Sequence, residues 1–96
     1  MYVLVTYDVT TVDKAGAKRL RSVAKICLEY GQRVQNSVFE MKLEPAQWTV
    51  CSTRLSDAID HNVDSLRFYH LGNNWANRID HVGVRKDFNI DGFLNV

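Results

Sequence analysis

Cysteine is scarce in this chain, and long apolar runs are absent. The only two cysteines, Cys27 and Cys51, belong to no Cys-x-x-Cys or Cys/His cluster, which argues against a zinc site and against a disulfide framework. We therefore expect both to be buried, reduced thiols. No segment approaches the roughly 20 consecutive apolar residues of a membrane span, and the N-terminus shows neither a basic region nor a cleavage signal. These absences predict a cytoplasmic protein without a membrane partner.

Motifs for covalent catalysis are missing as well. The chain has neither a glycine-rich phosphate loop nor a nucleophile elbow. Its three histidines, His61, His70 and His81, show no His-x-His or His-x-x-x-His spacing, which favours structural roles for them. Neither covalent catalysis nor a histidine metal centre has support in the sequence.

The composition is that of one small globular domain. A hydrophobic content of 46% with a charged content of 24% separates the chain from disordered sequences, and we predict a single domain over residues 1–96. A domain of this length buries only about 60–65% of the surface that its unfolded chain exposes. Association with a second copy would add the burial that a single copy lacks.

Charge is unevenly distributed along the chain, although the net charge is only +1. Residues 44–64 carry one basic residue against four acidic residues, a net charge of −3. Residues 13–33 carry a net charge of +4, because two acidic residues are outnumbered by six basic ones: Lys14, Lys18, Arg19, Arg21, Lys25 and Arg33. We therefore expect one basic flank and one acidic flank.

Hydrophobic periodicity predicts alternating strands and helices. Residues 2–9 are strand-like, and both alternating sets of side chains are largely apolar, so this strand is expected to be covered on both faces. Further strands are predicted at 34–43, 65–71 and 78–84.

Two helices are predicted between these strands. The first runs from about 13 to 30, with Asp13 as a cap candidate and Gly31 as a stop signal. The second begins near Pro45, which the first turn of a helix tolerates, and its apolar stripe ends at Ile59. Both helices are amphipathic, so each is expected to bury one face against the sheet.

We assign the chain to the α+β class as a ferredoxin-like β-α-β-β-α-β domain with a C-terminal extension. The two helices of that fold cover one face of the sheet only, whereas the strand at 2–9 is apolar on both faces. A homodimer in which two sheets pack face to face hides the second face. The tail at 85–96 is apolar enough to add an edge strand to the partner.

Asp8 is the one acidic residue in the otherwise apolar first strand. An ionised carboxylate there is costly unless it is paired, hydrogen-bonded or bound to a metal. One interpretation is structural, with Asp8 accepting hydrogen bonds from the turn at 9–12. The other is metal binding, in which a twofold axis brings two copies of Asp8 together to share one Mg²⁺ or Mn²⁺ ion.

The first predicted helix carries a basic face. Its members follow the spacing i, i+4, i+7, i+11 and are Lys14, Lys18, Arg21 and Lys25. Arg33, at the start of the next strand, extends this line of charge. The line predicts sequence-independent, salt-sensitive contacts with the phosphates of duplex DNA or RNA, although a solvated helix face has the same pattern.

Five strings carry a family resemblance: YVLVTYDV (2–9), GQRVQNSVFE (31–40), DSLRFY (64–69), LGNNW (71–75) and HVG (81–83). Together they resemble the small CRISPR-associated endoribonuclease family, the non-integrase subunit of spacer adaptation. The likeness is greatest to members from subtype I-C systems, in which the string over 32–40 is characteristic.

The resemblance implies a ferredoxin-like homodimer that works with the CRISPR integrase subunit in capturing foreign DNA. It also implies a catalytic, Mg²⁺-binding aspartate at the end of the first strand, which is Asp8 here, with motif positions at Tyr7, Arg33, Ser37 and Phe39 near it. Members of the family are described as metal-dependent nucleases and as scaffolds that position duplex DNA for the integrase, so both functions stay open. Fold analogy alone also leaves a ligand-binding regulator or an RNA-recognition module.

Overall fold

The computed structural model describes residues 1–72, so the predicted strand at 78–84 and the tail at 85–96 lie outside the described residues. Six elements follow one another in the described range: β1 (Tyr2–Asp8), α1 (Lys14–Tyr30), β2 (Gln32–Gln35), β3 (Val38–Lys42), α2 (Pro45–Ala58) and β4 (Ser65–His70). This is the β-α-β-β-α-β order of the ferredoxin-like fold, and the predicted α+β class is confirmed.

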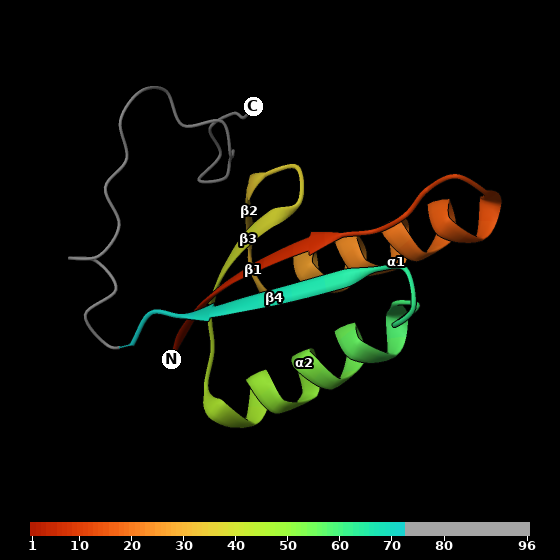
Figure 1. The fold of residues 1–96 in the computed structure, drawn as a ribbon. Helices are drawn as coiled ribbons and strands as arrows, with labels where there is room; N and C mark the ends of the chain where they lie inside the picture. Colours follow the sequence, from red (N-terminus) through yellow and green to blue (C-terminus); the bar gives the residue numbers. More distant parts are fainter. Residues whose placement is uncertain (73–96) are drawn as a thin grey trace.

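The strands form one sheet in the order β2-β3-β1-β4, and each neighbouring pair is antiparallel. Both helices lie on one side of this sheet (Figure 1). β1 is central, since it pairs with β3 along one edge and with β4 along the other. The other side of the sheet, which we call the open face, is covered by no element of residues 1–72 (Figure 1).

The prediction of one strand over 34–43 is wrong. The structure has a hairpin there, in which β2 and β3 are separated by the turn at Asn36 and Ser37. Two short polar residues are typical of a turn. The strand-like propensity of the residues on both sides outweighed this turn signal in the prediction. The register also shifts between Arg33 and Gln35, as in a β-bulge. The hairpin supplies the two strands that the fold requires between its helices.

Both predicted helix starts are confirmed, and local chemistry explains them. The carboxylate of Asp13 accepts a hydrogen bond from the backbone N–H of Gly16 at 2.8 Å, which caps α1. At the start of α2, the side-chain oxygen of Gln47 accepts a hydrogen bond from the N–H of Glu44 at 2.8 Å, and Pro45 follows in the first turn.

The core lies between the helices and the sheet. The largest fully buried side chains are Val3, Val5, Val23, Cys27, Phe39, Met41, Cys51 and Leu55. Burial raises the pKa of the Cys27 thiol to about 12 and that of Cys51 to about 11, so both stay protonated and unreactive. The prediction of buried, reduced cysteines is therefore confirmed. Within residues 1–72, the helices are too short or too polar to cross a membrane.

Replacing a buried side chain of α2 tests this core. Leu55 is fully buried and Val50, on the same helix, is 52% exposed. We expect Leu55→Ala to lower the free energy of unfolding by about 2–5 kcal/mol, because it leaves a cavity. Val50→Ala should change it by less than about 0.5 kcal/mol. Urea unfolding at one protein concentration measures both, and equal losses would contradict the assignment of the buried face of α2.

Candidate functional site

Asp8 is the last residue of β1, and its side chain lies on the open face. Tyr7 is buried on the helix side, so the alternation of the strand sends Asp8 the other way, where it is exposed. Its partner across the ladder is Ser65, the first residue of β4. The Asp8 carboxylate forms no hydrogen bond or ion pair with residues 1–72, and the turn at 9–12 donates none to it.

The chain that follows Asp8 is held by a buried carboxylate. The side chain of Asp64 is fully buried, and its Oδ1 accepts a hydrogen bond from the N–H of Thr10 at 2.9 Å. Its Oδ2 accepts from the N–H of Asp60 at 2.8 Å and from Nε of Arg19 at 2.8 Å. Asp64 therefore links α1, the end of α2 and the turn after β1.

These hydrogen bonds set the charge state of Asp64. The hydrogen bond from Arg19 is the largest influence, helped by the N–H groups of Asp60 and Thr10, and together they lower the pKa of Asp64 to about 2 despite the opposing effect of burial. Arg19 is therefore a structural residue, because its charge is paired with Asp64. The residues of the predicted basic face remain candidates for contact with a ligand.

The three motif positions Tyr7, Arg33 and Phe39 gather on the helix side of the sheet. The guanidinium carbon of Arg33 lies 5.1 Å from the centre of the Phe39 ring, and the rings of Tyr7 and Phe39 stack at 6.1 Å. Burial raises the pKa of Tyr7, so its hydroxyl is protonated and donates to the carbonyl of Asn36 at 3.3 Å. Ser37 accepts from the N–H of Tyr7 through its backbone oxygen, at 3.1 Å.

The sheet therefore separates this cluster from the Asp8 carboxylate. Tyr7 and Asp8 are adjacent in sequence, yet their side chains lie on opposite faces. Ser37 is the member of the set that sits at the hairpin turn, where the two faces meet.

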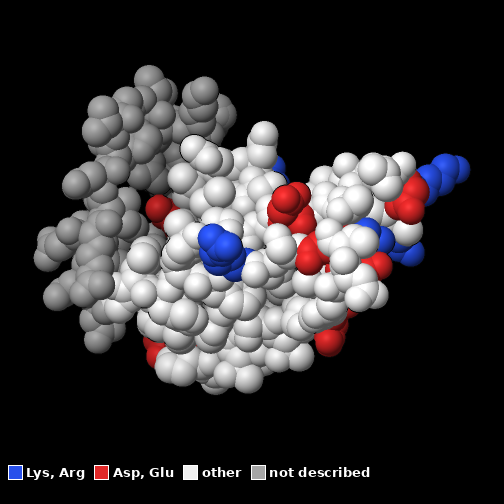
Figure 2. Space-filling view, viewed as in Figure 1, with Lys and Arg blue, Asp and Glu red and all other residues white. Residues whose placement is uncertain are grey.

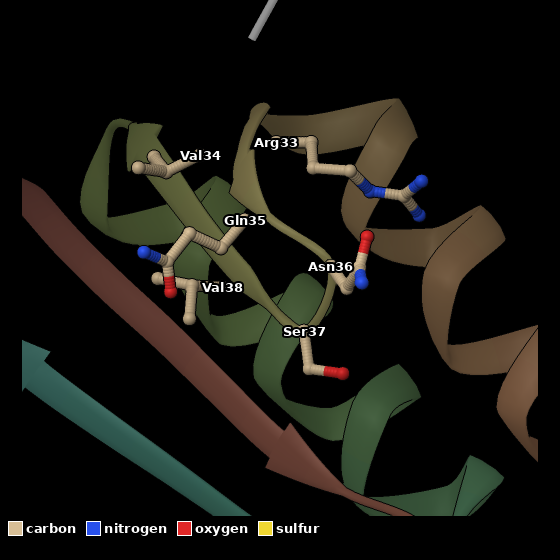
Figure 3. A pocket seen from close by; sticks show the side chains of 6 residues that line it. All are labelled: Arg33, Val34, Gln35, Asn36, Ser37 and Val38. Atoms are coloured by element: carbon tan, nitrogen blue, oxygen red, sulfur yellow. The ribbon is translucent and has the colours of Figure 1, made fainter. Parts of the chain in front are cut away.

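A hollow of about 580 Å³ is lined by the hairpin residues 33–38. Figure 3 shows the Arg33 and Asn36 side chains on the side of the hairpin that faces α1, with Gln35 and Val38 on the other side. Arg33 brings positive charge to this hollow, and the amides and hydroxyl of Gln35, Asn36 and Ser37 bring hydrogen-bonding groups.

The predicted basic face of α1 exists in the structure. All four of its residues are exposed: Lys14, Lys18, Arg21 and Lys25. α1 belongs to the helix layer, so this face and the Asp8 carboxylate lie in different layers of one chain. The basic face begins near Asp8 at the end of the molecule where β1 ends and α1 begins. Charged groups gather at that end (right side of Figure 2).

Arg67 of β4 is an exposed cation on the same face as Asp8, which was not predicted from the sequence. It pairs with Thr6, two residues along the ladder from the Asp8–Ser65 pair, so it lies on the same open face and is exposed. Its Nη1 donates to the hydroxyl of Tyr69 at 3.2 Å. Figure 2 shows a basic patch over β4 in a largely uncharged part of this face. The alternation of the string over 65–70 could have revealed it, since Arg67 and Tyr69 share a face.

The described part of the chain holds no group of three His, Cys, Asp or Glu side chains arranged to bind a metal ion. Asp8 therefore belongs to no such group within residues 1–72. A metal site that includes Asp8 would need ligands beyond residues 1–72 of one copy, from a source such as a second copy, water or phosphate oxygens.

Comparison with known proteins decides the family. Residues 1–79 match the family described as "CRISPR associated protein Cas2". The chain belongs to the Cas2 family. It is 54% identical over 92 residues to the protein named "CRISPR-associated endoribonuclease Cas2 3" of Rhodospirillum rubrum, covering 96% of this chain and 97% of the relative. It is 48% identical over 91 residues to the protein named "CRISPR-associated endonuclease Cas2" of Halalkalibacterium halodurans, covering 95% of each.

A solved Cas2 structure has the same fold. The crystal structure of Streptococcus pyogenes Cas2 at pH 6.5 superposes with a TM-score of 0.75 and is 57% identical, covering 86% of this chain and all of that one. The resemblance drawn from the five strings is confirmed at the level of the Cas2 family. The family match favours the CRISPR-associated functions over a ligand-binding regulator or an RNA-recognition module.

The charge state of Asp64 predicts how stability depends on pH. Its pKa is about 2 in the folded chain against an ordinary 3.8, so its contribution is present above pH 3.8 and is lost as the pH falls toward 2. We expect the difference in unfolding free energy between wild type and Asp64→Asn to shrink over this pH window. Urea unfolding at a series of pH values measures it, and a constant difference would show that the Asp64 carboxylate is not the cause.

Proposed function

We propose that this protein is the spacer-acquisition subunit of a subtype I-C CRISPR system, a homodimer that binds nucleic acid and works with the CRISPR integrase. We propose further that it is a metal-dependent endonuclease. The observation that carries the second proposal is the exposed Asp8 carboxylate at the end of β1. Support comes from the endonuclease and endoribonuclease names of its relatives and, for the subtype, from the string over 32–40.

The open face supports association with a second copy. Leu4 and Val38 are half-buried on it, and Tyr69 is 42% exposed. These apolar groups surround the middle of the sheet, where burial against an identical face stabilises both copies. A twofold axis near the end of β1 brings two Asp8 carboxylates together. We propose one domain over 1–96, with the tail at 85–96 as an added edge strand on the partner.

A pair of Asp8 carboxylates fits a divalent metal. Both oxygens of each are free of partners within residues 1–72, and Mg²⁺ commonly takes one or two carboxylates with water and phosphate oxygens completing its ligands. A bound Mg²⁺ or Mn²⁺ ion would stabilise negative charge on the phosphate and lower the pKa of a water ligand. The protein itself orients the carboxylates, which would repel each other without the metal.

The basic face of α1 supports contact with the nucleic-acid backbone. Lys14, Lys18, Arg21 and Lys25 form one row of exposed cations, and Arg33 adds a further cation at the hairpin. Such contacts read charge and shape rather than sequence. We propose that they hold duplex DNA or RNA while Asp8 faces the phosphodiester, with Tyr7, Ser37 and Phe39 supporting the end of the sheet.

A non-catalytic scaffold is the second candidate. Two observations favour it: no group of three metal-ligating side chains forms within residues 1–72, and the basic face lies in a different layer from Asp8 within one chain. In this function the dimer positions duplex DNA for the integrase and does not itself cleave a phosphodiester bond.

The Asp8→Asn substitution separates the two candidates. It removes the charge that binds metal while keeping the size of the side chain, so a nuclease should lose Mg²⁺-dependent cleavage by about 100-fold or more, whereas dimerisation should not change. Cleavage of labelled duplex DNA and RNA by purified wild type and variant measures this. Equal residual cleavage in both would point to a contaminant or to another site.

The same variant should be scored for spacer integration with the cognate integrase. A scaffold predicts normal integration by Asp8→Asn, and a required nuclease predicts its loss. Loss of integration with dimer, DNA and integrase binding all intact would end the purely structural account.

The basic face predicts a salt dependence. The triple substitution of Lys18, Arg21 and Lys25 by alanine should lower the affinity for duplex DNA. It should also flatten the slope of log K against log salt by about 0.9 for each phosphate that the variant no longer neutralises. The control is Arg54→Gln, which removes a cation that is already paired with Glu29 on the helix surface. Fluorescence anisotropy at several salt concentrations measures both, and identical slopes for triple variant and control would place the DNA elsewhere.

A further inference from the structure

Hydrogen bonds converge on Thr10, two residues after Asp8. Its N–H donates to Asp64 Oδ1 at 2.9 Å, and its hydroxyl donates to the carbonyl of Val63 at 2.8 Å. Its carbonyl accepts from Nη2 of Arg19 at 3.4 Å. The backbone N–H, the backbone carbonyl and the hydroxyl of Thr10 are thus all hydrogen-bonded to residues outside its own turn.

Packing adds to these bonds. Gly16 in the first turn of α1 approaches this loop so closely that a side-chain carbon there would overlap the carbonyl oxygen of Thr10. Asp13 is hydrogen-bonded to the N–H of the same glycine at 2.8 Å. The first turn of α1 is therefore seated directly against the chain that leaves β1.

Asp64 also acts across the ladder. The next residue, Ser65, opens β4 and is the register partner of Asp8. Asp8 is consequently bracketed on two sides: along the chain by Thr10, which is hydrogen-bonded to the Asp64 carboxylate, and across the sheet by Ser65, which follows Asp64 in the chain. Asp8 has no side-chain partner of its own among residues 1–72, so its position comes from the backbone alone.

We propose that Arg19 and Asp64 are positioning residues for the Asp8 carboxylate. Together with Thr10 they form a clamp that holds the end of β1 in the place from which Asp8 binds a divalent metal. This inference rests on the proposed metal-binding function of Asp8. Metal ligands must be held to within about 0.5 Å of their working positions. Loss of the groups that support a ligand commonly lowers metal affinity by about 10–100-fold.

The chain contains a control for the clamp. Arg54 and Glu29 form a second arginine–carboxylate pair between two elements, at 2.8 Å, near the other end of α1. Glu29 lies ten residues beyond Arg19 in the helix, about 15 Å along its axis. Arg19→Gln and Arg54→Gln therefore each remove an arginine that is paired with a carboxylate, Arg54 from the more exposed pair between α2 and α1, and only the first should affect Asp8.

The experiment measures Mn²⁺ affinity of full-length variants by electron paramagnetic resonance, at a temperature where circular dichroism shows each to be folded. We expect Arg19→Gln to weaken binding by about 10-fold or more and Arg54→Gln by less than about twofold. Asp8→Asn should abolish binding. Thr10→Val, which removes only the hydroxyl contact with Val63, should give a smaller loss in the same direction and serves if Arg19→Gln does not fold.

Three results would overturn the inference in different ways. If Asp8→Asn loses Mn²⁺ while Arg19→Gln and Thr10→Val bind as wild type does, the metal site stands and the clamp is wrong. If Asp8→Asn still binds Mn²⁺ like wild type, the proposed metal function fails, and the clamp has nothing to position. Equal weakening by Arg19→Gln and Arg54→Gln would assign the effect to general loss of stability and would also overturn the clamp.

Discussion

The pairing of β1 with both β3 and β4 is the constraint on which the rest of the molecule depends. A central strand is covered by neighbours on both edges, so its side chains must divide between two faces, and a shift of one residue would exchange them. Val3, Val5 and Tyr7 face the helices and are buried, and this choice leaves Asp8 on the opposite face. The position of Asp8, the candidate metal ligand, on the open face is a consequence of how the core packs.

The same constraint divides the charges. Cations of α1 lie in the helix layer, while Asp8 and Arg67 lie on the open face. A single chain therefore places the row of α1 cations and the Asp8 carboxylate on different sides of the molecule. Both come near one another where β1 passes into α1, and that junction is where Asp64 makes its hydrogen bonds to Thr10 and Arg19. These hydrogen bonds restrain the junction between β1 and α1.

Much of the fold could be read from the chain because the signals were local. Asp13 and Pro45 mark helix starts through hydrogen-bonding capacity and ring geometry, which need no tertiary context. The hairpin was missed because strand propensity and turn chemistry compete within residues 32–42, and pairing between two short strands resolves the competition. The sequence counted Arg19 only as one of the six basic residues over 13–33 and assigned it no partner; the folded chain pairs it with Asp64, far along the sequence.

By itself the sequence determined the helices, the apolar character of β1, the two inert thiols and membership of the Cas2 family, since each is written in composition, periodicity or a short string. Tertiary structure alone decided which face Asp8 occupies, that Arg19 pairs with Asp64, and which groups hydrogen-bond to the chain after β1. The reason is physical: hydrogen bonds and ion pairs such as Arg19–Asp64 join residues that are distant along the chain, and only the folded sheet determines which of them meet.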